Sequence, residues 1–246
     1  MRAPGRTPPT VFHVTHYKAG SQWIYSILRN CLPPQRLVRP QVDREQFLAD
    51  PVLPGKVYPT LYVTREEFES VELPFEWRRF VVIRDLRDAL VSGYFSVKIS
   101  HPQFQSEPVQ RLRRTLQTLD LEAGLIHMTQ TWLKTNAQIQ ESWLGAADVV
   151  RYEDLLERDA PILETVLLEK CELGIRRRRL RRAIKRARFE RVSGGRTRGQ
   201  EDVNAHQRKG IAGDWRNYFT PAVKEAFKER AGPILIAAGY ERDGDW

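Results

Sequence analysis

A lysine beside small residues marks the first segment that could do chemistry, residues 15–23 with the sequence THYKAGSQW. Gly20 and Ser21 allow backbone N–H groups to approach an anion closely, and the helix expected after them adds its partial positive charge. Lys18 adds a full positive charge. Because the lysine precedes the glycine, the segment is not a Walker A loop. It predicts a phosphate-binding turn, and the alternative is an ordinary turn between a strand and a helix.

A second phosphate contact is predicted in residues 83–92, IRDLRDALVS. Arg84 leaves a short apolar strand and Ser92 lies two helical turns further on, so both side chains could reach one phosphate. In the alternative, the charged residues 84–88 form a solvated cluster that caps the helix.

A third segment combines two cations with glycine, residues 206–215 with the sequence HQRKGIAGDW. Arg208 and Lys209 precede Gly210 in a polar, glycine-rich stretch. Such a loop could fold over a bound polyanion. The alternative is a charged loop that holds no ligand.

The elements that must position these segments are short strands followed by helices. β-Branched and apolar runs predict strands at residues 10–15, 56–64, 79–84 and 148–151, and three of them run directly into a helical pattern. This alternation predicts an α/β fold, a central and mostly parallel sheet flanked by helices on both faces. Ligands bind beyond the carboxyl ends of such strands. Further helical patterns cover residues 108–143 and 220–238.

Composition limits the class of protein. The chain has 246 residues, 41% of them hydrophobic, and a formal net charge of +9, which favours anionic ligands. Its two cysteines argue against a disulfide framework or a zinc site, and we expect no bound metal and a cytoplasmic location. No window reaches the ~18 apolar residues of a membrane span. We expect one domain over residues 1–246, with residues 1–9 flexible.

Together the three charged segments resemble, in order, the motifs of the family of sulfotransferases that depend on 3′-phosphoadenosine 5′-phosphosulfate (PAPS). THYKAGSQW is similar to the family's 5′-phosphosulfate loop, typically T-Y-P-K-S-G-T-T-W, and IRDLRDALVSGYFS is similar to its 3′-phosphate motif. RKGIAGDWRNYFT is close to the specific R-K-G-x-x-G-D-W signature. The resemblance implies a P-loop-NTPase-like sulfotransferase fold. It also implies an enzyme that transfers the sulfuryl group of PAPS to a hydroxyl or amine and releases PAP.

The resemblance also implies roles for individual residues. Lys18 would bind the 5′-phosphate oxygens and stabilise charge on the leaving group. Trp23 would pack on the purine, opposite Phe189. The implied donor contacts are Lys18, Gly20, Ser21, Gln22 and Trp23 at the phosphosulfate and purine, Arg84, Ser92, Arg208, Lys209 and Gly210 at the 3′-phosphate, and Tyr152 and Phe189 near adenine.

The general base and the acceptor site are less defined. The family's animal members carry a base histidine in a K-T-H segment, and the corresponding residues 58–62 contain no histidine. We predict His101 as the base. The open alternatives are His16, Tyr62 and the pair Glu66 and Glu67. For the acceptor, a small molecule, a sugar or a lipid, the predicted contacts are Tyr62, Phe95, Lys98 and His101.

Residues 175–191 support a rival function, because they contain ten basic residues and one acid. A non-catalytic protein that binds a polyanion or nucleic acid could use such a helix. An apolar stripe at residues 180, 183, 184 and 187 instead favours a helix with one solvated face. No aromatic strip for base stacking accompanies it, so we expect no nucleic-acid partner. The oligomeric state stays open, since proline follows Thr220 where the family's dimer motif has valine.

Overall fold

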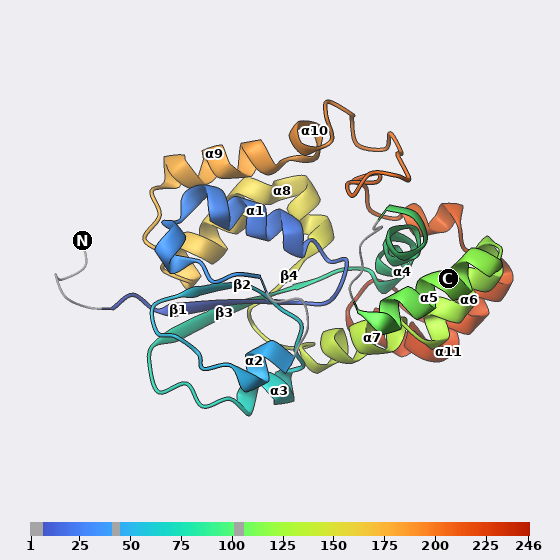
Figure 1. Ribbon diagram of the computed structural model, residues 1–246, viewed down its shortest axis with the longest axis horizontal. Helices are drawn as coiled ribbons and strands as arrows, with labels where there is room; N and C mark the ends of the chain where they lie inside the picture. Colours follow the sequence, from blue (N-terminus) through green and yellow to red (C-terminus); the bar gives the residue numbers. More distant parts are fainter. Residues whose placement is uncertain (1–6, 41–44, 101–105) are drawn as a thin grey trace. The chain divides into compact units, whose positions relative to one another are not determined.

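The computed structural model describes residues 7–40, 45–100 and 106–246, and the chain divides into two compact units (Figure 1). Met1–Ile83 and Ser142–Arg188 form the first, which we call the sheet unit. Arg84–Glu141 and Phe189–Trp246 form the second, the helical unit. The expectation of one domain over residues 1–246 stays a prediction, and residues 1–6 of the expected flexible terminus lie outside the described residues.

Four parallel strands form the sheet unit's core. They are β1 (Thr10–Thr15), β2 (Val57–Leu61), β3 (Trp77–Ile83) and β4 (Val149–Arg151), in the order β2-β1-β3-β4. Every residue of β1 is buried, which explains its continuous run of β-branched and aromatic residues. Pro59 is tolerated in β2 because this strand lies at the edge of the sheet. The parallel sheet predicted from the sequence is confirmed.

Helices cover both faces of this sheet (Figure 1). On one face lie α1 (Ser21–Cys31), α8 (Tyr152–Glu164) and α9 (Arg177–Ala187), and on the other α2 (Glu45–Ala49) and α3 (Arg65–Glu69). The first layer encloses an aliphatic core that includes Val11, Ile27 and Leu180. The second is aromatic, because Phe12 packs against Phe47 and Phe68. Two further helical segments are the 3₁₀ helix η1 (Pro34–Arg36) and the π-helix η3 (Thr165–Lys170).

The helical unit is built from α4 (Leu86–Phe95), η2 (Ser96–Ser100), α5 (Glu107–Thr118), α6 (Leu121–Gln130), α7 (Leu133–Ser142), α10 (Phe189–Val192), η4 (Asp214–Asn217) and α11 (Pro221–Ala237), with Ser142 itself in the sheet unit. The stretch 108–143, predicted to be helical, therefore contains three helices. Thr220 caps α11 by accepting from Val223 N at 3.3 Å, and Pro221 begins the helix. Within the described residues, no helix is both long and apolar enough to cross a membrane.

Candidate functional site

The turn after β1 has the backbone of an anion-binding site. Lys18 (φ 69°) and Gly20 (φ 93°) both adopt left-handed conformations, which are costly for a lysine and cluster at functional sites. α1 begins at Ser21 with no side-chain cap and no acidic residue in its first turn. The partial positive charge at the start of α1 is therefore left for a ligand. Gln22 is exposed at this end of the helix.

Gly20, Trp23 and Tyr152, all predicted donor contacts, come together in the sheet unit. A Cβ on Gly20 would lie 2.9 Å from Cδ2 and Cε2 of the Tyr152 ring, so only glycine fits there. The rings of Trp23 and Tyr152 meet edge to face at 5.9 Å. Trp23 Nε1 is buried and finds no hydrogen-bond partner among the described residues. An orphaned donor beside an aromatic pair fits a nucleotide ligand.

Tyr62 contacts residues on both sides of Lys18 in the turn after β1. Its hydroxyl donates to Ser21 Oγ at 3.0 Å, and its ring stacks on Tyr17 at 4.1 Å. Burial raises the pKa of Tyr62 to about 12, so the phenol keeps its proton at neutral pH. This opposes Tyr62 as a general base and gives it a role in positioning Ser21. Its predicted acceptor contact stays a prediction.

The other candidate bases are also constrained. Glu67 and Thr64 form the capping box of α3, because Thr64 N donates to Glu67 Oε2 at 2.8 Å. Glu66 is exposed on the same helix. His16 is 0% exposed, with Nδ1 3.0 Å from the carbonyl of Tyr17. His101, the predicted base, lies outside the described residues.

Asp88 organises a cluster of predicted site residues within the helical unit. It is 1% exposed and accepts from the N–H groups of Gly213 (2.7 Å) and Trp215 (2.9 Å), which pins the loop after Gly210 to α4. Burial raises its pKa. Arg84, at the start of α4, places Nη2 3.9 Å from Asp88 Oδ2. The alternative of a solvated cluster at residues 84–88 is wrong, because the charged members are buried, although Asp85 does cap α4.

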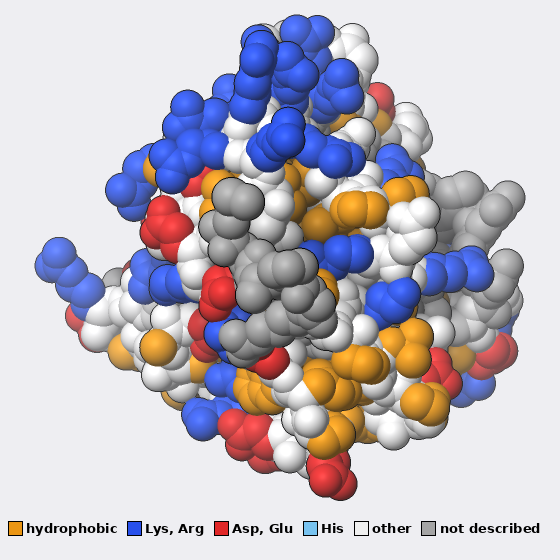
Figure 2. Space-filling model, turned by 90° about the vertical axis from the view of Figure 1, so that its left-hand side faces the viewer, with side chains coloured by type: hydrophobic (Ala, Val, Ile, Leu, Met, Phe, Trp, Pro, Cys, Tyr) orange, Lys and Arg blue, Asp and Glu red, His pale blue; other side chains and the backbone are white. Residues whose placement is uncertain are grey.

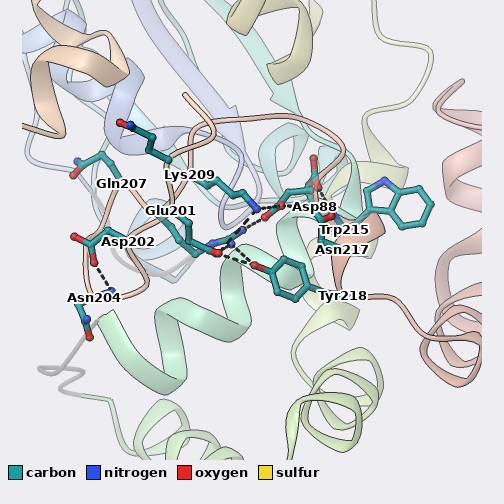
Figure 3. Close-up of polar contacts among 12 residues, drawn as sticks. Asp88, Glu201, Asp202, Asn204, Gln207, Lys209, Trp215, Asn217 and Tyr218 are labelled. Carbon is teal, nitrogen blue, oxygen red and sulfur yellow. Dashed lines mark hydrogen bonds and ion pairs between the residues drawn. The ribbon is translucent and has the colours of Figure 1, made fainter. Parts of the chain in front are cut away.

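The cations of residues 206–215, the third charged segment of the sequence, form ion pairs with carboxylates (Figure 3). Arg208 donates to both Glu201 and Asp214, and Lys209 Nζ lies 2.7 Å from Asp214 Oδ1. Burial raises the pKa of Asp214, but the hydrogen bonds from Lys209 and Arg208 outweigh it and hold that pKa below its usual range. Arg208 also donates to the hydroxyl of Tyr218 at 3.1 Å. This network was not expected from the sequence.

Gly210 and Phe189 also come together, within the helical unit. Gly210 has φ 68°, and a Cβ there would lie 2.4 Å from Cδ2 of the Phe189 ring. The guanidinium of Arg196 lies 5.3 Å from the centre of the same ring. A glycine is therefore required by both conformation and space.

The remaining predicted residues lie along α4 and η2. Ser92 is half-buried on α4, and Phe95 at its end lies under the guanidinium of Arg208, 4.7 Å from the ring centre. Lys98 donates to Tyr94 Oη at 2.9 Å and to the carbonyl of Leu119 at 2.8 Å. These bonds give Lys98 a structural role, and its acceptor contact stays a prediction. Within residues 7–40, 45–100 and 106–246, no cluster of His, Cys, Asp and Glu could hold a metal.

The parallel sheet and the uncapped turn after its first buried strand define an α/β protein suited to a phosphorylated ligand. A family model described as "Sulfotransferase domain" matches residues 77–235. Since the match covers more than half of the chain, the chain belongs to the sulfotransferase domain family. The predicted family and enzyme class are confirmed.

Solved structures support the same fold. A mouse sulfotransferase, SULT7A1, complexed with PAP is 15% identical, with a TM-score of 0.54 over 96% of this chain and 89% of that chain. A retinol dehydratase in complex with retinol and PAP is 15% identical, with a TM-score of 0.52 over 94% of this chain and 82% of that chain. No curated protein matches the sequence significantly. The rival of a non-catalytic polyanion-binding protein receives no support.

Proposed function

We propose that this protein transfers the sulfuryl group of PAPS to a hydroxyl or amine of an acceptor and releases PAP. The observation that carries the proposal is the turn after β1, where Lys18 and Gly20 adopt left-handed backbone in front of an uncapped helix. Family membership supports sulfuryl transfer. Both solved structures compared above are complexes with PAP, which supports a donor of this type.

The residues of the sheet unit suit the reacting end of the donor. As the acceptor oxygen bonds to sulfur, the bond from sulfur to the 5′-phosphate oxygen breaks and leaves its electron pair on that oxygen. The ammonium of Lys18 and the N–H groups at the start of α1 offset this negative charge. Ser21, held by Tyr62, and Gln22 donate further hydrogen bonds. Trp23 and Tyr152 bind the adenine ring of the donor.

The residues of the helical unit suit the 3′-phosphate. Arg84 and Ser92 flank the first turns of α4, and Arg208, Lys209 and Gly210 lie on the loop that Asp88 pins to the same helix. A phosphate that binds Arg208 and Lys209 must share these cations with Asp214 and Glu201. Phe189 adds an aromatic surface beside Gly210.

The molecule that receives the sulfuryl group, and the general base that takes its proton, are proposals as well. Since Tyr62 keeps its proton and Glu67 caps α3, His101 remains the proposed base. The acceptor is proposed to be a small molecule, a sugar or a lipid with a free hydroxyl or amine. We expect no metal requirement and a cytoplasmic location.

The test is acceptor-dependent release of PAP. Purified protein is incubated with PAPS and a panel of phenols, aliphatic alcohols and amines, and PAP is quantified by chromatography. Adenosine 5′-phosphosulfate, which lacks the 3′-phosphate, serves as the control donor. We expect at least one acceptor to be sulfated with PAPS and to react far more slowly with the control donor. Equal rates with both donors would contradict the proposed role of the 3′-phosphate.

A further inference from the structure

Helix α9 carries a cluster of arginines that the proposed function does not use. We call Arg176, Arg178, Arg179, Arg182 and Arg186 the arginine face; all are exposed. Figure 2 shows Lys and Arg side chains gathered over the upper part of the displayed surface, where α9 lies. The opposite side of the helix is buried in the aliphatic core through Leu180, Ala183, Ile184 and Ala187. The cations are therefore fixed on a rigid element.

The arginine face borders a hollow in the sheet unit. A volume of about 710 Å³ lies between α9 and the end of α1, and its lining includes Asn30, Pro33, Leu173 and all members of the arginine face. Arg178 and Arg182 also line a second hollow of about 530 Å³ on the other flank of α9. Both spaces are open to solvent and lined by arginines, so an anionic ligand can reach these side chains.

Three nearby arginines have carboxylate partners, whereas the arginine face has none among the described residues. Arg177 and Arg181 pair with Glu164, and Arg188 pairs with Asp159 at 2.8 Å. No member of the arginine face forms a side-chain hydrogen bond or ion pair with any residue that the structure describes. These guanidinium groups therefore offer their donors to solvent or to a ligand.

The arrangement is electrostatically unfavourable without an anion. Arg178, Arg182 and Arg186 repeat at i, i+4 spacing, which brings like charges side by side. Arg176 and Arg178 lie at the start of α9, whose first turn has no acidic residue, so their charge adds to the positive end of the helix dipole. A bound anion would relieve both costs.

The hollow is separate from the turn that carries Lys18. It lies against residues 30–33, whereas that turn precedes Ser21 at the other end of α1. At 1.5 Å per residue, the 11 residues of α1 span about 16 Å. A ligand in the hollow is therefore not the reacting end of the donor.

We propose that the arginine face binds an anion with two or more phosphate groups. Arginine presents a planar fork that matches phosphate in two parallel hydrogen bonds, and each phosphate monoester carries a charge of about −1.5 to −2 near neutral pH. Several forks around one hollow match several phosphates better than a single carboxylate or sulfate. The source is a soluble polyphosphate compound or the headgroup of a polyphosphorylated lipid.

The test compares two double variants that remove the same charge from exposed helices. Arg178→Ala with Arg182→Ala alters the arginine face, and Arg111→Ala with Arg114→Ala alters α5, where both side chains are more than half exposed (74% and 63%). Tripolyphosphate is titrated calorimetrically into each protein with and without saturating PAP, so that the donor site can be occupied. Vesicles with a bisphosphorylated inositol lipid form the second arm, and polyglutamate is the matched carboxylate polyanion.

We expect tripolyphosphate to bind the unmodified protein even with PAP present, and at least ~10-fold more weakly to the Arg178/Arg182 variant. The α5 variant should bind within about twofold of the unmodified protein, and PAPS turnover should be unchanged in both variants. Arginine-dependent binding in only one arm would support the site and identify the source. Equal losses in both variants, no binding in either arm, or equal affinity for polyglutamate would overturn the proposal. The comparison of the two variants stands even if PAP does not bind, so it can fail independently of the proposed function.

Discussion

The turn after β1 and the loop around Arg208 are both cationic, but different forces hold their cations. Lys18 is placed by left-handed backbone at an uncapped helix start, so the backbone itself shapes the proposed anion site. Arg208 and Lys209 are placed by Asp214 and Glu201, and an incoming phosphate must share them with these carboxylates. The difference teaches that cation count alone does not locate an anion site. Backbone conformation and internal counterions decide what remains for a ligand.

The largest expected effect is on catalysis at the first turn. Lys18→Ala should lower turnover by ~10²–10³-fold, because it removes a charge that offsets the leaving phosphate. Lys18→Gly should lower turnover equally while relieving the strain of φ 69°. Initial rates of PAP release check both variants, and exposed Lys134→Ala is the control. Normal turnover in Lys18→Ala would remove the turn from the mechanism.

Acidification should weaken the strand that leads into this turn. His13 in β1 is buried, stacked on Phe80 and bonded to the carbonyl of Pro59, and burial lowers its pKa to about 4. In the unfolded chain His13 has its ordinary pKa of 6.5, so as the pH falls below 6.5 the unfolded state takes up a proton before the folded state does. The contribution of His13 to the free energy of unfolding is therefore fully present above pH 6.5 and is lost as the pH falls to about 4. The full loss is about 3 kcal/mol, at about 1.4 kcal/mol per pKa unit.

The measurement is the free energy of unfolding in urea at pH 8 to 4. His13→Gln should flatten the slope between pH 6.5 and 4. An unchanged slope in that variant would assign the acid sensitivity to other groups. Asp88 in the helical unit acts in the opposite direction, because its raised pKa makes the folded state take up the proton first.

Glycine replacements compare the two regions directly. Gly20→Ala should destabilise the protein by about 2 kcal/mol, because it adds a clash with Tyr152 to the cost of positive φ. Gly145→Ala, with φ +81° and open space around it, should cost about 1 kcal/mol. Gly210→Ala and Gly199→Ala form the matched pair in the helical unit, because both positions have positive φ but only a Cβ at Gly210 would meet the Phe189 ring. Gly210→Ala should therefore cost more stability than Gly199→Ala. Thermal melts check all four, and equal losses within either pair would mean that the aromatic contact does not constrain the loop.

The smallest effect is on donor affinity in the helical unit. Arg84→Ala should raise KM for PAPS by ~10-fold with little change in KM for the acceptor, since only the donor loses a charge-assisted hydrogen bond. Steady-state kinetics with each substrate varied in turn check this. A larger rise in the acceptor KM would relocate Arg84 to the acceptor side.

The sequence predicted the elements well where one residue pattern determines one structure. Buried parallel strands need continuous apolar runs, so β1 and β3 and the turns after them were predicted from their residues, and the half-buried β4 was predicted from its short apolar run. β2 passes through Pro59, which cannot donate a hydrogen bond and is tolerated because the strand lies at the sheet edge. The breaks between α5, α6 and α7 were not expected, and Asp120, which caps the start of α6, was the available signal for one of them.

Side-chain partners were less predictable, since they depend on residues far apart in the chain. Tyr62 reaches Ser21 across 41 positions and Asp88 reaches Gly213 across 125, so neither contact has a local signal. Glu201 and Asp214 lie within seven residues of Arg208, and their opposite charge was the available signal for the network that neutralises it.

The central claim is that the protein recognises a nucleotide with a 3′-phosphate. Calorimetric titration of the purified protein with PAP, AMP and ATP, without Mg²⁺, tests it most directly. We predict that PAP binds at least ~100-fold more tightly than AMP or ATP, which corresponds to about 2.7 kcal/mol. Equal affinity for PAP and AMP would contradict the account, because Arg84, Arg208 and Lys209 would then contribute nothing to donor recognition.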